Sequence, residues 1–268
     1  MNNNNIRFEL SFKNISQLEN KLNFCKLKNI RNINIPCKGI IKKELFKSAI
    51  NYTSKNFPEF NVTNHYSLYH QYSKNKNKSY QDFLDFIKNS ESNRKYEILL
   101  ISGSSKKKNF DTVEVLDYLK KEINLKVKVG IAYNPYLKKY YNIASERERF
   151  ERKISTGLIN SIWLQYGTDI EVLQNEVTFL NNVIKDEKIN LFGSLFIPSK
   201  QFITRFKFRP WKELYISEKY LYSLENFSDF TRDLVSFYKR NNITPVIESD
   251  FSTSEKLASV YSFLENER

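Results

Sequence analysis

Apolar, β-rich runs recur along the chain, and each is followed by a stretch with the periodicity of a helix. Several of these runs are continuously apolar, which is typical of parallel strands buried on both faces. The pattern predicts eight strands, at Ile6–Phe12, Asn32–Cys37, Phe60–Tyr66, Glu97–Ser102, Val127–Tyr133, Ser161–Tyr166, Leu191–Pro198 and Ile243–Glu248.

Hydroxyl residues followed three positions later by glutamate mark where helices are expected to begin. In this capping-box pattern, the hydroxyl and the carboxylate each accept a hydrogen bond from an amide group without a partner in the helix. The pattern predicts helix starts at Ser16–Glu19, Ser145–Glu148, Thr168–Glu171 and Ser252–Glu255, with Asp111–Glu114 as a looser version.

The alternation of strands and helices indicates parallel pairing, because each connection is long enough for a crossover. Eight such units in about 250 residues predict an α/β fold, a single (β/α)8 TIM barrel. A doubly wound open sheet is the alternative, but no glycine-rich fingerprint follows the first strand. No Pro/Gly/Ser linker or internal repeat divides the chain, so we expect one domain over residues 1–268, with 1–5 as a disordered Asn-rich tail.

One connection is longer than the others. An insertion at residues 199–228 follows the seventh strand and contains Arg205, Arg209 and Trp211, and a further helix is expected at Ser228–Arg240. We predict an enlarged loop after strand 7 that lies over the mouth of the barrel, the end where the strands finish. Its arginines and aromatic residues suit a lid, a partner surface or both.

The composition is that of an ordinary globular protein. The chain has 268 residues, of which 40% are hydrophobic, enough for a sizeable core. No apolar run approaches the roughly 20 residues of a membrane helix, and the first residues do not resemble a signal peptide. Two cysteines, Cys25 and Cys37, make no disulfide framework, so a reducing, cytoplasmic location is expected.

The net charge of +13 could indicate a polyanionic partner. The lysines are scattered rather than gathered in one stripe, so we predict neither a nucleic-acid nor a membrane partner. A basic nucleic-acid-binding protein is kept as a hypothesis that rests on charge alone. Lysines at a barrel mouth would instead attract an anionic small molecule, such as a nucleotide or a polyglutamylated cofactor.

Polar residues late in the strands are the candidates for chemistry in a barrel. Glu9 lies between Phe8 and Leu10 and is expected to point inward, where burial would raise its pKa and suit a general acid. A structural ion pair is the alternative. His65 ends the third strand and could position a ligand, move a proton or be structural. With His70 it has no clear third ligand, so no metal site is predicted.

The next three strands also end in polar residues. Ser102, Gly103 and Ser104 follow the fourth strand, where the glycine permits close approach and the hydroxyls can donate to a phosphate or a pterin edge. A plain turn explains them almost as well. The primary amides of Asn134 and Gln165 match a heterocycle with donors and acceptors, unless they brace loops. No P-loop, nucleophile elbow, HExxH or kinase signature is present.

Short segments along the barrel resemble the methylenetetrahydrofolate reductase family, most closely between Glu97 and Gln165. Phe8-Glu9-Leu10 is similar to the family's F-E-F, and Asn64-His65-Tyr66-Ser67 stands where the family has H-L-T-C. Gly130–Pro135 resembles its G-V-A-x-Y-P, and Arg152-Lys153 with Gly157 resembles its L-K-x-K-V-D-A-G-A. Gln165 matches the glutamine of its T-Q-x-x-F.

The resemblance implies an NAD(P)H-dependent reduction of 5,10-methylenetetrahydrofolate to 5-methyltetrahydrofolate. Glu9 would then be the catalytic residue at the pterin. Gln165, Ser102 and Ser104 would contact the folate substrate. His65, Gly103, Tyr133, Asn134 and Lys153 would line the flavin or nicotinamide groove. Lys153 is otherwise interpreted as an ordinary solvated lysine on the helix before Gly157.

Three departures from the family pattern fall on its flavin side. Ser104 replaces an aspartate near the flavin, Asn134 replaces a tyrosine, and Ile35–Gly39 replaces a glycine-rich segment. The resemblance therefore implies a divergent member that keeps a pterin site, and FAD is a cofactor the sequence permits without requiring it. The alternative is a non-catalytic folate- or nucleotide-binding barrel that acts as a regulator or accessory subunit. Homo-oligomer formation is left open.

Overall fold

Eight strands form a closed barrel in the order β1-β2-β3-β4-β5-β6-β7-β8, which confirms the predicted (β/α)8 fold. The computed structural model describes residues 6–39, 41–91, 96–103, 109–122, 126–137, 143–185, 188–211 and 214–265. The predicted tail at 1–5 lies outside them. The strands are β1 (Arg7–Glu9), β2 (Asn32–Ile35), β3 (Asn61–Ser67), β4 (Tyr96–Ile101), β5 (Lys128–Tyr133), β6 (Ile159–Leu164), β7 (Asn190–Leu195) and β8 (Ile243–Ile247).

All eight predicted strands are present, with small differences at their ends. The largest is in β1, which covers three residues of the predicted Ile6–Phe12. Its last ladder contact is made by the amide of Leu10, which donates to the carbonyl of Asn34 at 2.9 Å. Glu9 therefore sits at the carboxyl end of its strand, where the chain leaves the sheet.

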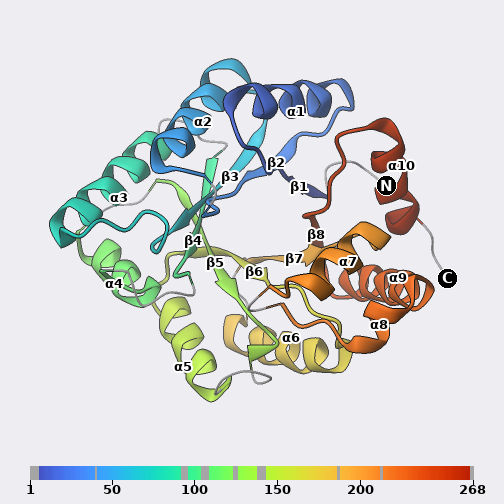
Figure 1. The fold of residues 1–268 in the computed structure, drawn as a ribbon. Coiled ribbons are helices and arrows are strands. Elements are labelled where there is room, and N and C mark those ends of the chain that lie inside the picture. The colour runs from blue at the N-terminus through green and yellow to red at the C-terminus, as the bar shows by residue number, and fades with distance from the viewer. Residues whose placement is uncertain are drawn as a thin grey trace. The chain divides into compact units, whose positions relative to one another are not determined.

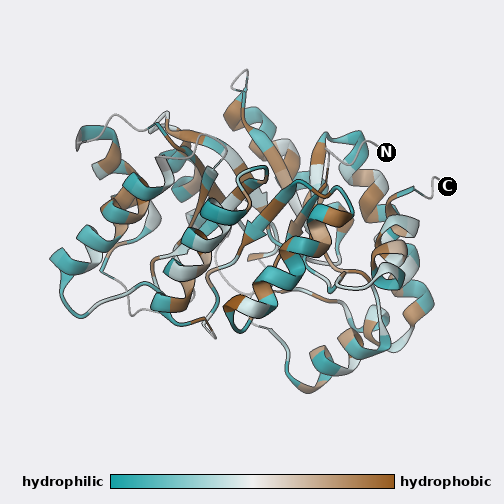
Figure 2. Ribbon diagram, turned by 90° about the horizontal axis from the view of Figure 1, so that it is seen from above, coloured by the Kyte–Doolittle hydropathy of each residue, from teal (hydrophilic) through white to brown (hydrophobic). Residues whose placement is uncertain are grey.

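Helices connect the strands, and Figure 2 shows polar and apolar residues alternating along them, as amphipathic helices require. In α9, for example, Phe227, Phe230, Leu234 and Phe237 are buried on one side. The helices are α1 (Ile15–Leu27), α2 (Lys43–Asn56), α3 (Lys76–Glu91), α4 (Thr112–Glu122), α5 (Ile143–Ile154), α6 (Ile170–Ile184), α7 (Lys200–Phe208), α8 (Glu218–Tyr222), α9 (Leu224–Arg240) and α10 (Ser254–Glu265).

The predicted helix starts are close but mostly displaced. The carboxylate of Asp111 accepts from the amide of Glu114, while the amide of Asp111 donates to the carboxylate of Glu114, so this looser match is a true capping box. The caps at the predicted Ser16, Thr168 and Ser252 boxes are instead Asn14, Asp169 and Thr253. Asn and Asp cap at least as well as hydroxyls, which explains two of these shifts. Ser145 lies inside α5.

The long connection after β7 is helical rather than an open loop. It contains α7 and the short α8, and the further helix starts at Leu224 instead of Ser228. The hydroxyl of Ser199 caps α7 by accepting from the amide of Phe202 at 3.1 Å. The predicted enlargement after strand 7 is confirmed, and its placement over the barrel mouth stays a prediction.

The chain divides into two compact units by its contacts. The first unit runs up to Ala132 and includes Arg152–Ser161, and the second contains Tyr133–Glu151 and Ile162 onward. Within the first unit, α1 to α4 lie outside β1 to β4 (Figure 1). Among the described residues, we find no helix with the length and apolarity to cross a membrane. The expectation of a single domain stays a prediction.

Candidate functional site at the carboxyl ends of β1 to β3

A buried polar network occupies one face of the first strands. The guanidinium of Arg7 donates to Asn34 Oδ1 at 2.9 Å and to Thr63 Oγ1 at 2.7 Å. Thr63 donates in turn to a carboxylate oxygen of Glu97 at 3.2 Å, and the hydroxyl of Ser161 donates to the other. Burial lowers the pKa of Arg7 to about 10, which leaves it charged at neutral pH. This network is paired and structural.

Glu9 and His65 lie one layer nearer the carboxyl ends. Each follows a network residue, Arg7 or Thr63, by two positions, so its side chain points to the same face of the strand. Glu9 is also the register partner of Asn34 across β1 and β2. The Nδ1 atom of His65 lies 3.9 Å from Glu9 Oε2, with 10% and 4% of the two side chains exposed. The structure thus brings together two residues that the sequence selected separately.

Lys38 completes this cluster from the loop after β2. Its Nζ lies 2.5 Å from Glu9 Oε1, while 46% of its own side chain is exposed to solvent. Burial raises the pKa of Glu9, but the charge of Lys38 and, less strongly, the charge that His65 gains when protonated in acid hold it below its ordinary value. The expected raised pKa is therefore wrong: Glu9 is a carboxylate and hydrogen-bond acceptor at neutral pH.

His65 is neutral in the same surroundings. Burial lowers its pKa to about 4; Glu9 opposes this effect, whereas the charges of Lys38 and Arg7 add to it. In register with Glu9, the side chain of Asn34 is fully buried, and its Nδ2 has no hydrogen-bond partner among the described residues. The cluster therefore offers an ionised acceptor, a neutral imidazole, a buried amide donor and a solvent-facing ammonium.

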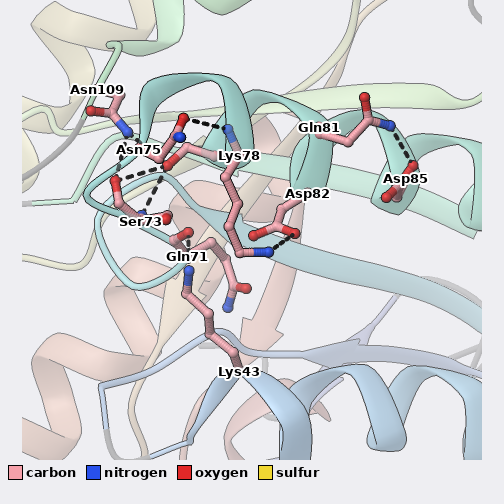
Figure 3. A network of polar contacts seen from close by, with 10 residues as sticks. Lys43, Gln71, Ser73, Asn75, Lys78, Gln81, Asp82, Asp85 and Asn109 are labelled. Atoms are coloured by element: carbon pink, nitrogen blue, oxygen red, sulfur yellow. Dashed lines mark hydrogen bonds and ion pairs between the residues drawn. The ribbon is translucent and has the colours of Figure 1, made fainter.

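The loop after β3 contacts the loop after β2, which carries Lys38, and fixes its position. Gln71 Nε2 donates to Cys37 Sγ at 3.2 Å, and Figure 3 shows Lys43 donating to the carbonyl of Gln71 at 2.6 Å. A Cβ on Gly39 would come within 2.9 Å of the His70 ring, so the ring packs directly against this glycine. Contacts on both sides of Lys38 thus fix the backbone that presents it to Glu9.

The same loop is tied to the start of α3. Asn109 Nδ2 donates to the carbonyl of Ser73 (Figure 3). It also donates to Ser79 Oγ, and the hydroxyl of Ser79 donates to the same carbonyl of Ser73. The Lys78–Asp82 pair lies nearby on α3 at 3.5 Å. These contacts stabilise the loop rather than offering groups to a ligand.

The predicted glycine-serine site after β4 is filled by protein. Gly103 has φ +77°, and a Cβ there would lie 2.6 Å from Tyr69 Cβ and 3.3 Å from Ser67 Oγ. The space above this glycine therefore belongs to Tyr69. Ser102 shares a hydrogen bond of 3.0 Å with Thr112. Ser104 lies outside the described residues.

Asn134 and Gln165 lie in the second unit, at the ends of neighbouring strands. The amide of Gln165 donates to the carbonyl of Tyr133 at 2.9 Å. The side-chain oxygen of Asn134 accepts from the amide of Tyr136, and that of Gln165 accepts from the amide of Tyr166. Both side chains are half-buried, and both oxygens brace local turns.

Tyr133 takes part in a buried clamp. Its hydroxyl donates to Glu176 Oε2 at 2.5 Å, and Arg147 donates to Glu176 Oε1 at 2.7 Å. Burial and the neighbouring carboxylate raise the pKa of Tyr133, so it remains a neutral donor. The clamp joins β5, α5 and α6. It also engages the hydroxyl of Tyr133, the residue that the sequence predicted to face a cofactor.

Lys153 is buried, with 4% of the residue exposed, which contradicts its interpretation as an ordinary solvated lysine. Its carbonyl accepts from the hydroxyl of Thr156 at 2.6 Å, near the end of α5. Within the described ranges, no three His, Cys, Asp or Glu side chains gather as metal ligands would.

Sequence reasoning missed Lys38 and Asn34 as site residues. Lys38 follows β2 directly, in Ile35-Pro36-Cys37-Lys38-Gly39, and satisfies the end-of-strand criterion that selected His65. From the sequence, Lys38 is considered only as part of Ile35–Gly39, the segment that replaces a glycine-rich motif of the family. In the sequence, Asn34 lies within a strand and has no feature that marks it as a site residue. Only the strand register shows that it lies next to Glu9.

Comparisons with known proteins support the fold. No family model and no curated protein matches this chain. An uncharacterized protein from Clostridium thermocellum, described as binding two copies of 5-methyl-5,6,7,8-tetrahydrofolic acid, has a TM-score of 0.60 at 10% identity over 97% of this chain and 93% of its own. A Pyrococcus furiosus chitinase domain has a TM-score of 0.52 at 10% identity, covering 98% and 97% of the two chains. Xylanase A of P fluorescens subsp. cellulosa has a TM-score of 0.54 at 10% identity, covering 97% of each chain. At this identity the likeness concerns the barrel alone.

Proposed function

We propose that this barrel binds a reduced folate at the carboxyl ends of β1 to β3. The observation that carries the proposal is the buried, ionised carboxylate of Glu9 with Lys38 at 2.5 Å. A pterin presents a ring N–H beside an exocyclic amino group, and one carboxylate can accept from both. The Nδ2 of Asn34 supplies a donor for the pterin carbonyl.

Lys38 suits the other end of such a ligand. A folate carries at least one glutamate carboxylate, and an exposed ammonium attracts it through solvent. Lys38 pairs with Glu9, and the N–H groups of a bound pterin would take over that role. Lys38 would then be released toward the anionic part of the ligand.

The fold comparison supports the ligand class. The Clostridium thermocellum protein pairs a barrel of this kind with a bound methyltetrahydrofolate. The chitinase and the xylanase carry sugar chemistry on the same fold, so the fold by itself selects no ligand. The cluster around Glu9 is therefore the feature on which the assignment rests.

A second candidate is the reduction itself, favoured by the path that Lys38 gives a proton from solvent to Glu9. Hydride from NAD(P)H would reduce the methylene carbon of 5,10-methylenetetrahydrofolate. Its bond to N10 would break as Lys38, through Glu9, delivers a proton to that nitrogen. The products are 5-methyltetrahydrofolate and NAD(P)+, an exchange that belongs to one-carbon metabolism in the cytoplasm.

The residues predicted for a flavin fit that group poorly. Tyr69 fills the space above Gly103, Asn134 caps its own turn, and the hydroxyl of Tyr133 is bonded to Glu176. We derive no step through FAD, and a nicotinamide would act as a co-substrate.

One experiment separates the two candidates. The purified protein is mixed with NADH or NADPH and 5,10-methylenetetrahydrofolate, and the nicotinamide absorbance is followed. Folate-dependent loss of the reduced nicotinamide identifies the reductase. Binding of 5-methyltetrahydrofolate without nicotinamide oxidation identifies the non-catalytic barrel. No binding of either folate contradicts both.

A further inference from the structure

The connection after β7 carries most of the exposed apolar surface. Four large apolar side chains are exposed among the described residues, and three lie here: Phe208 at 91%, Tyr222 at 77% and Trp211 at 37%. The fourth is Leu27 on α1, at 79%. We call Arg205, Lys207, Phe208, Trp211 and Tyr222 the α7–α8 patch.

The geometry of α7 places Phe208 outward. Phe202 and Phe206 lie four positions apart on its inner face, and their rings stack at 6.2 Å. Phe208 follows Phe206 by two positions, about 200° around the helix, and so projects from the opposite face. Arg205 and Lys207 flank it and are exposed.

Two contacts assemble the rest of the patch. Lys207 Nζ lies 4.0 Å from the centre of the Tyr222 ring, which brings α8 beside the end of α7. Trp211 packs its ring against Phe202 and Phe206, at 5.8 and 6.2 Å, and leaves the remainder exposed. The exposed aromatic side chains of the patch thus lie among the cations Arg205 and Lys207.

The exposed charges along α7, α8 and the residues that follow each helix are mainly positive among the described residues. Lys200, Arg209 and Lys219 are exposed in addition to Arg205 and Lys207, against the acidic Glu218 and Glu225. Aromatic side chains set among lysines and arginines are the pattern of segments that enter the interface of an anionic bilayer.

We propose that the α7–α8 patch docks on an anionic phospholipid surface. This goes beyond folate binding and departs from the prediction of no membrane partner, which rested on lysines that are scattered along the sequence. Nucleic acid fits less well, because base stacking needs free ring faces, and Lys207 covers a face of Tyr222 while protein packs against Trp211. Phe208, at 91% exposed, is then the one ring of the patch open to a base. A second copy of this chain would bring like charges together.

The two tryptophans provide a direct test. Trp163 is buried and stacks on Phe192 at 4.2 Å, so a change in emission on binding reports Trp211. We expect a blue shift with mixed vesicles of phosphatidylcholine and phosphatidylglycerol, and none with phosphatidylcholine alone. High salt should weaken the effect, and Trp211→Phe should remove it. No shift on anionic vesicles overturns the proposal.

Matched variants locate the docking surface. Phe208→Ser should weaken vesicle partitioning about tenfold, the scale expected when one buried aromatic contact is lost. Leu27→Ser is the control, because Leu27 is also largely exposed, at 79%, and also lies between two lysines, Lys26 and Lys28. Equal losses for both variants would overturn the proposal, as would vesicle binding abolished by a short oligonucleotide that binds the patch more tightly.

Discussion

The ammonium nitrogen of Lys38 lies 2.5 Å from a carboxylate oxygen of Glu9, and this contact reverses the effect of burial on the acid. Burial alone would favour the protonated form, as a general acid near neutral pH requires. With Lys38 present, the pKa of Glu9 is lowered instead. Glu9 is therefore equipped to accept hydrogen bonds from a ligand, and Lys38 is the charged neighbour that can pass it a proton.

The stability of the fold should fall on acidification because of His65. Its folded-state pKa is about 4, against an ordinary value of 6.5, so the unfolded chain takes up the proton first. The stabilisation is complete above pH 6.5 and is lost as pH falls toward 4, by about 3 kcal/mol at most. Denaturant unfolding across this range measures the loss. An NMR titration of His65 with an ordinary pKa would contradict it.

Gly103 should be intolerant of a side chain. Gly103→Ala places a Cβ 2.6 Å from Tyr69 at φ +77°, whereas Gly157→Ala meets nothing within 4 Å at φ +72°. Backbone strain should lower the free energy of unfolding of both variants by about 1 kcal/mol. The steric clash should lower that of Gly103→Ala by roughly 1–3 kcal/mol more. Equal unfolding midpoints would show that Tyr69 does not fill this space.

Asn64 is a site where a polar side chain weakens the fold. It is fully buried on β3, and neither its Nδ2 nor its Oδ1 has a hydrogen-bond partner among the described residues. Asn64→Leu should raise the free energy of unfolding by about 1–2 kcal/mol, because two desolvated groups are removed. Folate affinity should stay unchanged. A loss of stability would indicate a buried water bound to the amide.

Tyr133 should matter for stability rather than for ligand binding. Tyr133→Phe removes the hydroxyl that donates to the buried Glu176, while Arg147 still pairs with that carboxylate. We expect a loss of about 1–2 kcal/mol by denaturant unfolding, with unchanged folate affinity. Normal stability with weakened binding of a nicotinamide or flavin would instead return Tyr133 to its predicted cofactor role.

The barrel could be predicted from the sequence because parallel strands and amphipathic helices have strong hydrophobic periodicity. The eight apolar runs match β1 to β8, and the extra length after Leu195 correctly indicated an enlarged connection. The ends of the helices could be predicted less well. Helices α1 and α6 are capped by Asn14 and Asp169, where the sequence offered nearby hydroxyl residues as competing caps.

The candidate site around Glu9 could be predicted only in part, because it depends on contacts between segments that are distant in the sequence. Glu9 and His65 were selected by strand position, and their side chains do meet. The pKa of Glu9 could not be predicted, because its sign depends on Lys38 from another loop. The remaining candidates, among them Gly103 and Tyr133, show local patterns that a ligand site and a packed loop share.

The most direct test of the account is calorimetric titration of 5-methyltetrahydrofolate into the wild-type protein and two matched variants. Glu9→Gln removes the carboxylate beside Lys38, and Glu59→Gln removes one paired with Lys26 at 3.0 Å, outside the site. Loss of a charged hydrogen-bond pair predicts binding about 10- to 100-fold weaker in Glu9→Gln and unchanged in Glu59→Gln. Wild-type binding that Glu9→Gln leaves intact, in a variant that remains folded, would contradict the assignment of the site.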